Sequence, residues 1–166
     1  IRNVLDSRPD VVELSLDYYG SRHDESRGVK GLFDKAMKLV SLAVQNGISV
    51  VVRSTLMKDN IQDILKIRGH LDRCGFKEVP VLGMPVRGAP KLKPSRQQIE
   101  ELLNIDGIYL SDSCPAGISS FVITPKREVL ACIFYRKRLG QFQEFTKDEF
   151  DEIIENGAKI PRFPCE

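Results

Sequence analysis

The sequence predicts an α/β fold in which parallel strands alternate with helices and a small α+β domain follows. Three short apolar segments, Val11–Leu16, Ile48–Val52 and Val79–Met84, have the length and composition of buried strands. Between them, residues 31–46 and 60–75 place apolar side chains at helical spacing. Strand, helix, strand, helix, strand implies two right-handed crossovers and therefore a parallel sheet, for which both a barrel and a doubly wound sheet are open.

Local signals mark the ends of the two predicted helices. Gly47 and Gly75 stop them, as glycine does at the C-terminal end of many helices. Asn60 is the expected N-cap of the second helix, and Asp63 at the third helical position completes an approximate capping box. The polar, glycine-punctuated segment 18–30 is predicted to be a loop.

The composition changes after the third strand. Two prolines, a glycine and three basic residues in Arg87–Pro94 indicate an extended linker. Capping boxes begin two further helices, one at Ser95 and one at Thr146. Between these helices, 121–124 and 128–132 are predicted to form an antiparallel hairpin.

Composition and charge exclude several classes of protein. The 25 basic and 23 acidic residues give a net charge of +2, which argues against nucleic acid or a membrane surface as a partner. No apolar run reaches about 18 residues and no leader opens the chain, so we expect a cytoplasmic protein. In that compartment the four cysteines are thiols or metal ligands rather than a disulfide framework. Because the chain starts at Ile1 without a methionine, we expect it to be a piece of a longer protein.

Polar side chains follow the predicted strands at their C-terminal ends, where the loops of parallel α/β folds converge on working sites. Ser15 and Asp17 alternate along the first strand, so the pleat directs both to one side. Arg53 follows the second strand and Met84 ends the third. Capping or loop roles remain an open interpretation for these residues.

The sequence motifs around these positions resemble those of radical S-adenosylmethionine (radical SAM) enzymes. Val-Glu-Leu-Ser-Leu-Asp (12–17), His-Asp-x-x-Arg-Gly (23–28) and the helix after it are similar to the family's fourth strand, loop and helix. Residues 48–60 resemble its fifth strand and residues 79–88 its sixth. Cys-Pro-Ala-Gly (114–117), followed by the hairpin ending at Cys132, resembles the start of SPASM and twitch domains.

The resemblance implies a domain organisation and a fold. Residues 1–92 would be the C-terminal half of a partial TIM-like (β/α) barrel, with three of six parallel strands. Residues 93–110 would be a connecting helix and linker, and 111–166 a SPASM- or twitch-like domain that binds an auxiliary iron-sulfur cluster.

The resemblance also assigns roles to individual residues. Ser15 would bind the ribose of S-adenosylmethionine (SAM) and Arg27 its methionine carboxylate. Asp17 would hold a polar group in the same cavity, and Arg53 would face cofactor or substrate. Met84, with Leu82, would pack the adenine, although barrel core is the alternative for both. No catalytic residue is assigned.

Three cysteines are the expected ligands of the auxiliary cluster: Cys114, Cys132 and Cys165. Free cysteines or a zinc site are the alternatives, and zinc is disfavoured because no Cys-x-x-Cys pair or nearby histidine is present. We expect Cys74 to be a buried or half-buried thiol without a function. The chain departs from the family at Arg127, where a hairpin glycine is usual, and lacks both Cys-x-x-x-Cys-x-x-Cys and a Gly-Gly-Glu motif.

In such enzymes a [4Fe–4S] cluster reduces SAM, and the 5′-deoxyadenosyl radical abstracts a hydrogen from a peptide, a protein or a cofactor precursor. An electron donor such as ferredoxin or flavodoxin is then implied, and this piece alone should be inactive. One rival is a non-catalytic α/β binding or scaffold protein. A second rival is a barrel hydrolase or aldolase that uses Asp17, His23 or Arg53 as acid, base or anion-binding group. Without such a role, His23 would be a solvated loop residue, like Arg22 and Asp24.

Overall fold

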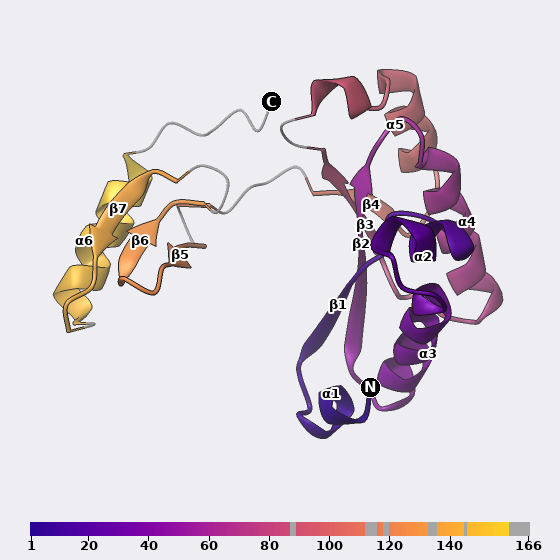
Figure 1. Cartoon of the computed structure of the whole chain (residues 1–166), viewed down its shortest axis with the longest axis horizontal. Helices are drawn as coiled ribbons and strands as arrows, with labels where there is room; N and C mark the ends of the chain where they lie inside the picture. The colour runs from indigo at the N-terminus through magenta and orange to yellow at the C-terminus, as the bar shows by residue number, and fades with distance from the viewer. Residues whose placement is uncertain (87–88, 112–115, 118–119, 133–135, 145, 160–166) are drawn as a thin grey trace. The chain divides into compact units, whose positions relative to one another are not determined.

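The computed structural model of the chain divides into two compact units, Ile1–Asp112 and Ser113–Cys165 (Figure 1). The structure describes residues 1–86, 89–111, 116–117, 120–132, 136–144 and 146–159. In this part of the chain, no helix is long and apolar enough to cross a membrane.

The first unit contains a parallel sheet of four strands, which confirms the predicted α/β class. They are β1 (Val11–Ser15), β2 (Ser49–Leu56), β3 (Val81–Pro85) and β4 (Ile108–Leu110), in the order β1-β2-β3-β4. This unbroken order fits the wall of a barrel, and it equally fits one half of a doubly wound sheet, which reverses direction only at its switch point. The sequence predicted three strands and assigned β4 to the connecting segment. That count was wrong because β4 has only three residues, too few for a period-2 pattern to be recognised.

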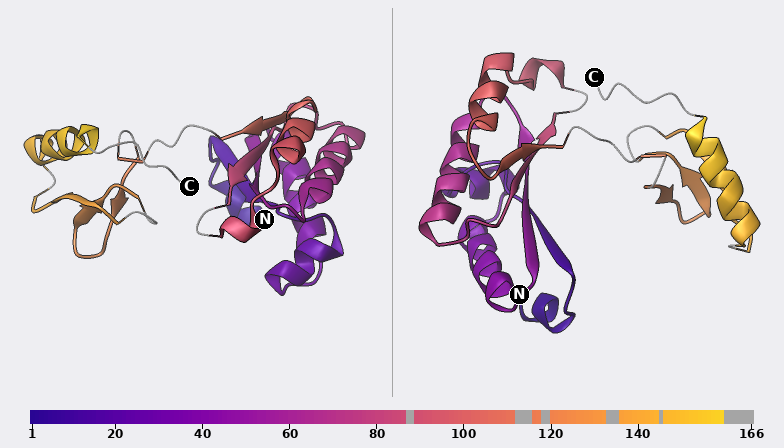
Figure 2. Two further views of the ribbon diagram at one scale, coloured as in Figure 1. Left: turned by 90° about the horizontal axis from the view of Figure 1, so that it is seen from above. Right: turned by 180° about the vertical axis from the view of Figure 1, so that it is seen from behind.

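Helices alternate with the strands of this sheet. The α-helices α2, α3, α4 and α5 lie on one face (Figures 1 and 2). α2 lies in the segment predicted to be a loop, and Gly20 and Gly28, both at positive φ, flank it. The helices of the first unit are α1 (Arg2–Asp6), α2 (Ser21–Arg27), α3 (Leu32–Gln45), α4 (Ile61–Arg73) and α5 (Arg96–Leu103), with a 3-10 helix η1 (Pro90–Leu92).

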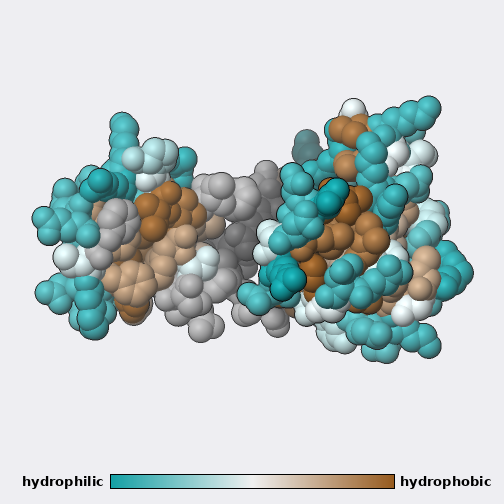
Figure 3. Space-filling view, turned by 90° about the horizontal axis from the view of Figure 1, so that it is seen from below, coloured by the Kyte–Doolittle hydropathy of each residue, from teal (hydrophilic) through white to brown (hydrophobic). Residues whose placement is uncertain are grey.

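The two faces of the sheet differ in burial. Along β2, Val50, Val52 and Leu56 are buried toward the helices, whereas the intervening side chains are only half-buried. The uniformly apolar segment Ile48–Val52 predicts a strand buried on both faces, and for β2 this expectation was wrong. On the half-exposed face Val11 is 48% and Tyr109 52% exposed, and apolar side chains reach the surface of the first unit (Figure 3). This face, opposite the helices, carries Ser15, Arg53 and Met84.

The described residues of the second unit form a three-stranded antiparallel sheet and one helix. It consists of β5 (Val122–Ile123), β6 (Glu128–Leu130), β7 (Arg138–Gln141) and α6 (Lys147–Ala158). The hairpin of β5 and β6 confirms the prediction, and β7 is a further strand that was not predicted. Arg127, at the glycine position of the family pattern, has φ +61°, so it adopts the left-handed conformation that a glycine adopts readily. The capping boxes at Ser95 and Thr146 are both confirmed.

Candidate functional site

The predicted residues of the first unit lie on or directly after three adjacent strands. Arg53 was expected just past the end of the second strand, and this was wrong, because β2 continues to Leu56 and places Arg53 inside the strand. Ser15 is in register with Arg53, and Arg53 with Leu82, which places the three in one row across β1, β2 and β3. Met84 is in register with Thr55 in the next row. Since residues in one row of a pleated sheet point to the same face, this row and Met84 belong to the half-exposed face.

Asp17 and Arg27 form an ion pair at the mouth of the sheet. The Nη2 atom of Arg27 donates to Oδ2 of Asp17 at 2.6 Å, and the second oxygen of Asp17 accepts from the backbone N–H of Thr55 at 2.7 Å. The Asp17 side chain is only 15% exposed, whereas that of Arg27 is 43% exposed. Arg27 thus presents an accessible guanidinium that a mostly buried carboxylate holds in place.

Asn60 connects the ends of β1 and β2. Its side-chain amide donates to the backbone carbonyls of Asp17 (2.8 Å) and Thr55 (2.7 Å), and its carbonyl oxygen accepts from the N–H of Met57 (2.9 Å). Asn60 is fully buried, and its three side-chain hydrogen bonds are all made to backbone groups of the protein. The predicted capping box of Asn60 with Asp63 was therefore wrong, because the Asn60 side chain binds the strand ends instead of the first turn of α4.

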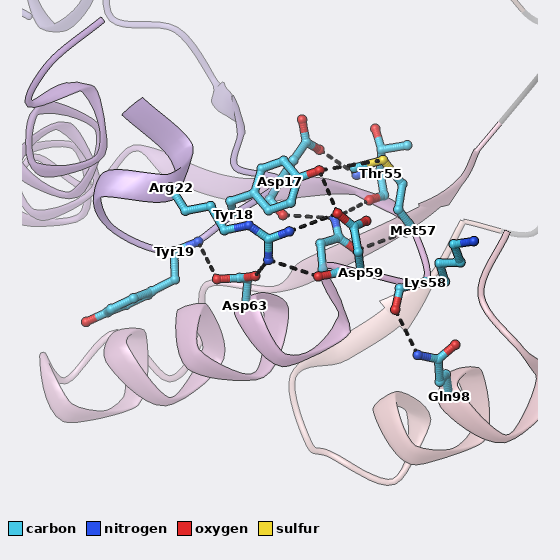
Figure 4. Close-up of polar contacts among 11 residues, drawn as sticks. Asp17, Tyr18, Tyr19, Arg22, Thr55, Met57, Lys58, Asp59, Asp63 and Gln98 are labelled. Carbon is cyan, nitrogen blue, oxygen red and sulfur yellow. Dashed lines mark hydrogen bonds and ion pairs between the residues drawn. The ribbon is translucent and has the colours of Figure 1, made fainter. Parts of the chain in front are cut away.

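An arginine holds the segment after β1 against the start of α4 (Figure 4). Arg22 donates to a carboxylate oxygen of Asp63 at 2.5 Å and to one of Asp59 at 2.8 Å, and its guanidinium lies 4.3 Å from the centre of the Tyr18 ring. The other Asp63 oxygen accepts from the N–H of Tyr19 at 3.2 Å. Burial, and then the negative charge of Asp59, raises the pKa of Tyr18. Arg22, whose side chain is 44% exposed, therefore belongs to helix α2 and forms ion pairs instead of lying free in a loop.

His23 and Asp24 were also expected to be solvated, and this expectation was wrong. Asp24 accepts hydrogen bonds from the backbone N–H groups of Gly31 (2.5 Å) and Phe33 (2.8 Å) at the start of α3. These backbone bonds, that of Phe33 first, lower the pKa of Asp24. His23 is 1% exposed and packs near Phe33, and its Nδ1 has no hydrogen-bond partner within the described residues. Burial, and then the charge of Arg27, lowers the pKa of His23.

Arg53 forms a two-point ion pair with Glu13 on the neighbouring strand. Its Nε and Nη2 atoms donate to the two Glu13 oxygens at 2.8 and 2.7 Å, and Nη1 lies 3.5 Å from the sulfur of Met84. Hydrogen bonding to Arg53 lowers the pKa of Glu13, and the bond to Glu13 raises the pKa of Arg53. Sequence reasoning missed Glu13. Its alternation with Ser15 and Asp17 along one strand was the available signal.

The expected ligands of the auxiliary cluster are only partly described. Cys132 is half-buried two residues after the end of β6, while Cys114 and Cys165 lie outside the described residues. Within the described residues, no group of three or more His, Cys, Asp or Glu side chains could hold a metal ion. Cys74 is exposed, so the expectation of a buried or half-buried thiol was wrong.

Two glycines bring α6 close to the segment after Cys114. Gly117 has φ +75°, and a Cβ on it would lie 3.4 Å from the Cβ of Ala131, next to Cys132. A Cβ on Gly157 of α6 would lie only 1.9 Å from the Gly117 carbonyl oxygen. The backbone of α6 therefore packs directly on Gly117, the last residue of the Cys-Pro-Ala-Gly pattern.

Comparison with known proteins finds a relative among the radical SAM enzymes. Fe-coproporphyrin III synthase of Methanosarcina barkeri (strain Fusaro / DSM 804) is 40% identical to the chain over 53 residues. The matched stretch is 32% of this chain but only 13% of the synthase, so the similarity is weak and partial. No family model matches the chain.

Proposed function

We propose that the chain is the C-terminal part of a radical SAM enzyme, in which the first unit supplies part of the SAM-binding barrel and the second an auxiliary cluster domain. The observation that carries the proposal is a chain of neighbouring residues at the end of β1. Ser15 is in register with Arg53, Arg53 contacts Met84, and Asp17 binds Arg27. The partial similarity to a radical SAM enzyme supports it independently.

The residues at this edge fit the chemical groups of SAM. The guanidinium of Arg27 would pair with the methionine carboxylate, and its ion pair with Asp17 keeps it oriented toward the strand ends. The exposed Ser15 at the end of β1 would hydrogen-bond the ribose. Met84 and Leu82, both half-buried on this face, would contact the adenine.

Bound together, a [4Fe–4S] cluster and SAM supply the electron and the 5′-deoxyadenosyl radical for hydrogen abstraction. The ligands of that cluster are not among the cysteines of this chain, which contains no Cys-x-x-x-Cys-x-x-Cys pattern. The role of the chain's own residues is to bind and orient SAM and substrate and to exclude water from the radical. Cys114, Cys132 and Cys165 would hold the auxiliary iron-sulfur cluster.

The substrate is a peptide, a protein or a cofactor precursor, and the name of the relative favours a precursor of the tetrapyrrole type. An electron donor such as ferredoxin or flavodoxin reduces the catalytic cluster. The near-neutral charge fits an enzyme of the cytoplasm that binds neither nucleic acid nor membranes.

Iron content tests the cluster assignment. The full-length protein, purified without oxygen and reconstituted with iron and sulfide, should contain more iron than one [4Fe–4S] cluster requires, because the second unit holds a further cluster. Replacing Cys114, Cys132 and Cys165 with alanine should lower the iron content to that of one cluster.

Cys74→Ala is the matched control, since Cys74 is an exposed cysteine of the first unit. This variant should keep the iron content of the unmodified protein. An unaltered iron content in the triple variant would contradict the auxiliary cluster. A colourless protein that does not bind SAM would instead favour the non-catalytic scaffold.

A further inference from the structure

Arg53 uses only one of its two hydrogen-bonding edges. A guanidinium can bind a carboxylate with two parallel bonds through its Nε–Nη2 edge or through its Nη1–Nη2 edge. Glu13 occupies the first edge completely, with bonds of 2.8 and 2.7 Å. On the second edge, the partner of Nη1 within the described residues is the Met84 sulfur, at 3.5 Å. A thioether sulfur is a weak hydrogen-bond acceptor.

The open edge lies on the half-exposed face of the sheet. The Arg53 side chain is 36% exposed, and Ser15, its neighbour in register on β1, is exposed as well. Leu82 and Tyr109 follow in the same row on β3 and β4, so aliphatic and aromatic side chains lie on one side of the pair. Such surroundings strengthen a charge-assisted hydrogen bond once a ligand covers them.

We propose that the Nη1–Nη2 edge of Arg53 binds a carboxylate of the substrate, and that Glu13 is the residue that positions Arg53 for it. The assignment to substrate rests on the proposed function, in which Arg27 already takes the carboxylate of SAM. A singly charged planar group fits best, because the negative charge of Glu13 on the opposite edge repels a doubly charged phosphate.

Nuclear magnetic resonance of the ¹⁵N-labelled chain tests the site directly, with sodium propionate as the probe. The Nε–Hε and Nη signals of Arg53, identified by their loss in Arg53→Lys, should shift in a saturable way. Propionamide, which has the same shape without the charge, should not shift them. A propionate titration that leaves the Arg53 signals in place overturns the proposal.

Two arginine variants separate this edge from a general attraction of anions. Arg53→Lys keeps the charge but lacks the planar edge, so propionate should bind at least about tenfold more weakly. The binding is measured in this variant from the shifts of the backbone amide signals of β2. Arg96 forms an ion pair through Nε with Glu100 on the exposed surface of α5, so Arg96→Lys should leave propionate binding unchanged. Equal weakening in both variants contradicts a specific site.

The positioning role of Glu13 has its own readout. In the unmodified chain the two-point bond should hinder rotation about the Nε–Cζ bond of Arg53 and keep its Nη signals separate. Glu13→Gln should merge these signals, an effect that a mere loss of stability does not produce. Separate signals in Glu13→Gln contradict the role.

SAM itself distinguishes the substrate from the cofactor. In the full-length protein, saturating SAM should leave propionate binding at Arg53 intact, and displacement of propionate by SAM would overturn the proposal. A full-length protein that binds propionate at Arg53 but no SAM would contradict the proposed function while leaving the carboxylate site standing.

Discussion

Single residues in the segment after β1 have structural roles, although the polar sequence of this segment predicts a loop. Asp24 binds the first turn of α3, whose own N-cap residue, Gly31, has no side chain to offer. A carboxylate at a helix N-terminus satisfies free N–H groups and interacts favourably with the helix dipole. Asp24 therefore acts as the cap of α3 from seven to nine residues upstream.

Asp24→Ala should lower the melting temperature of the chain at pH 7, as followed by circular dichroism. The pKa of Asp24 is lowered in the folded state, so its contribution is present above the ordinary value of 3.8 and is lost as the pH falls below it. The difference in melting temperature between the two proteins should accordingly shrink near pH 3. Glu25→Ala, a neighbouring exposed carboxylate, is the control and should change little.

His23 should make the first unit sensitive to mild acid. Its pKa is lowered in the folded protein, so the unfolded chain binds a proton first as the pH falls below the ordinary value of 6.5. Stability should be full above that pH and decline below it. Urea midpoints at pH 7.5 and 5.5 should differ less in His23→Leu than in the unmodified chain, and an unchanged difference would assign the effect to another group.

At the scale of elements, close backbone packing decides where glycine is required. The carbonyl oxygen of Gly117 occupies the space that a Cβ on Gly157 would need. Gly69, in the middle of α4, has only the flexible end of the Arg73 side chain near its Cβ position, at 3.4 Å. Both glycines lie within helices, but their surroundings leave them different freedom to change.

Opposite effects are expected from alanine at these two glycines. Gly69→Ala should raise the free energy of unfolding by up to about 1 kcal/mol, the usual gain in a helix interior. Gly157→Ala should lower it by about 1 to 3 kcal/mol, because α6 or the Gly117 loop must move. Urea denaturation followed by circular dichroism measures both, and stabilisation by Gly157→Ala would show that α6 does not pack as closely as described.

At the scale of the whole molecule, the polar residues at the mouth of the sheet form a connected set. Asn60 joins the ends of β1 and β2, and Arg22 fastens the segment after β1 to α4. These bonds hold Asp17, and through it Arg27, at the edge where SAM is proposed to bind. A cofactor site at such an edge benefits because its residues are oriented before the ligand arrives.

The sequence by itself determined the alternation of strands and helices, the two capping boxes, the hairpin and the polar residues at the strand ends. Each of these follows from side chains a few positions apart, so the local pattern is enough to predict it.

Only the tertiary structure decided which of the polar residues pair. Glu13 and Arg53 are 40 residues apart, Asn60 and Asp17 43 residues, and Arg22 and Asp63 41 residues. Parallel strands are joined by crossovers that contain whole helices, so residues brought together at one edge of the sheet share no local pattern. β4 was missed for another reason: its three residues are too few for a recognisable pattern, and only their pairing with β3 identifies them as a strand.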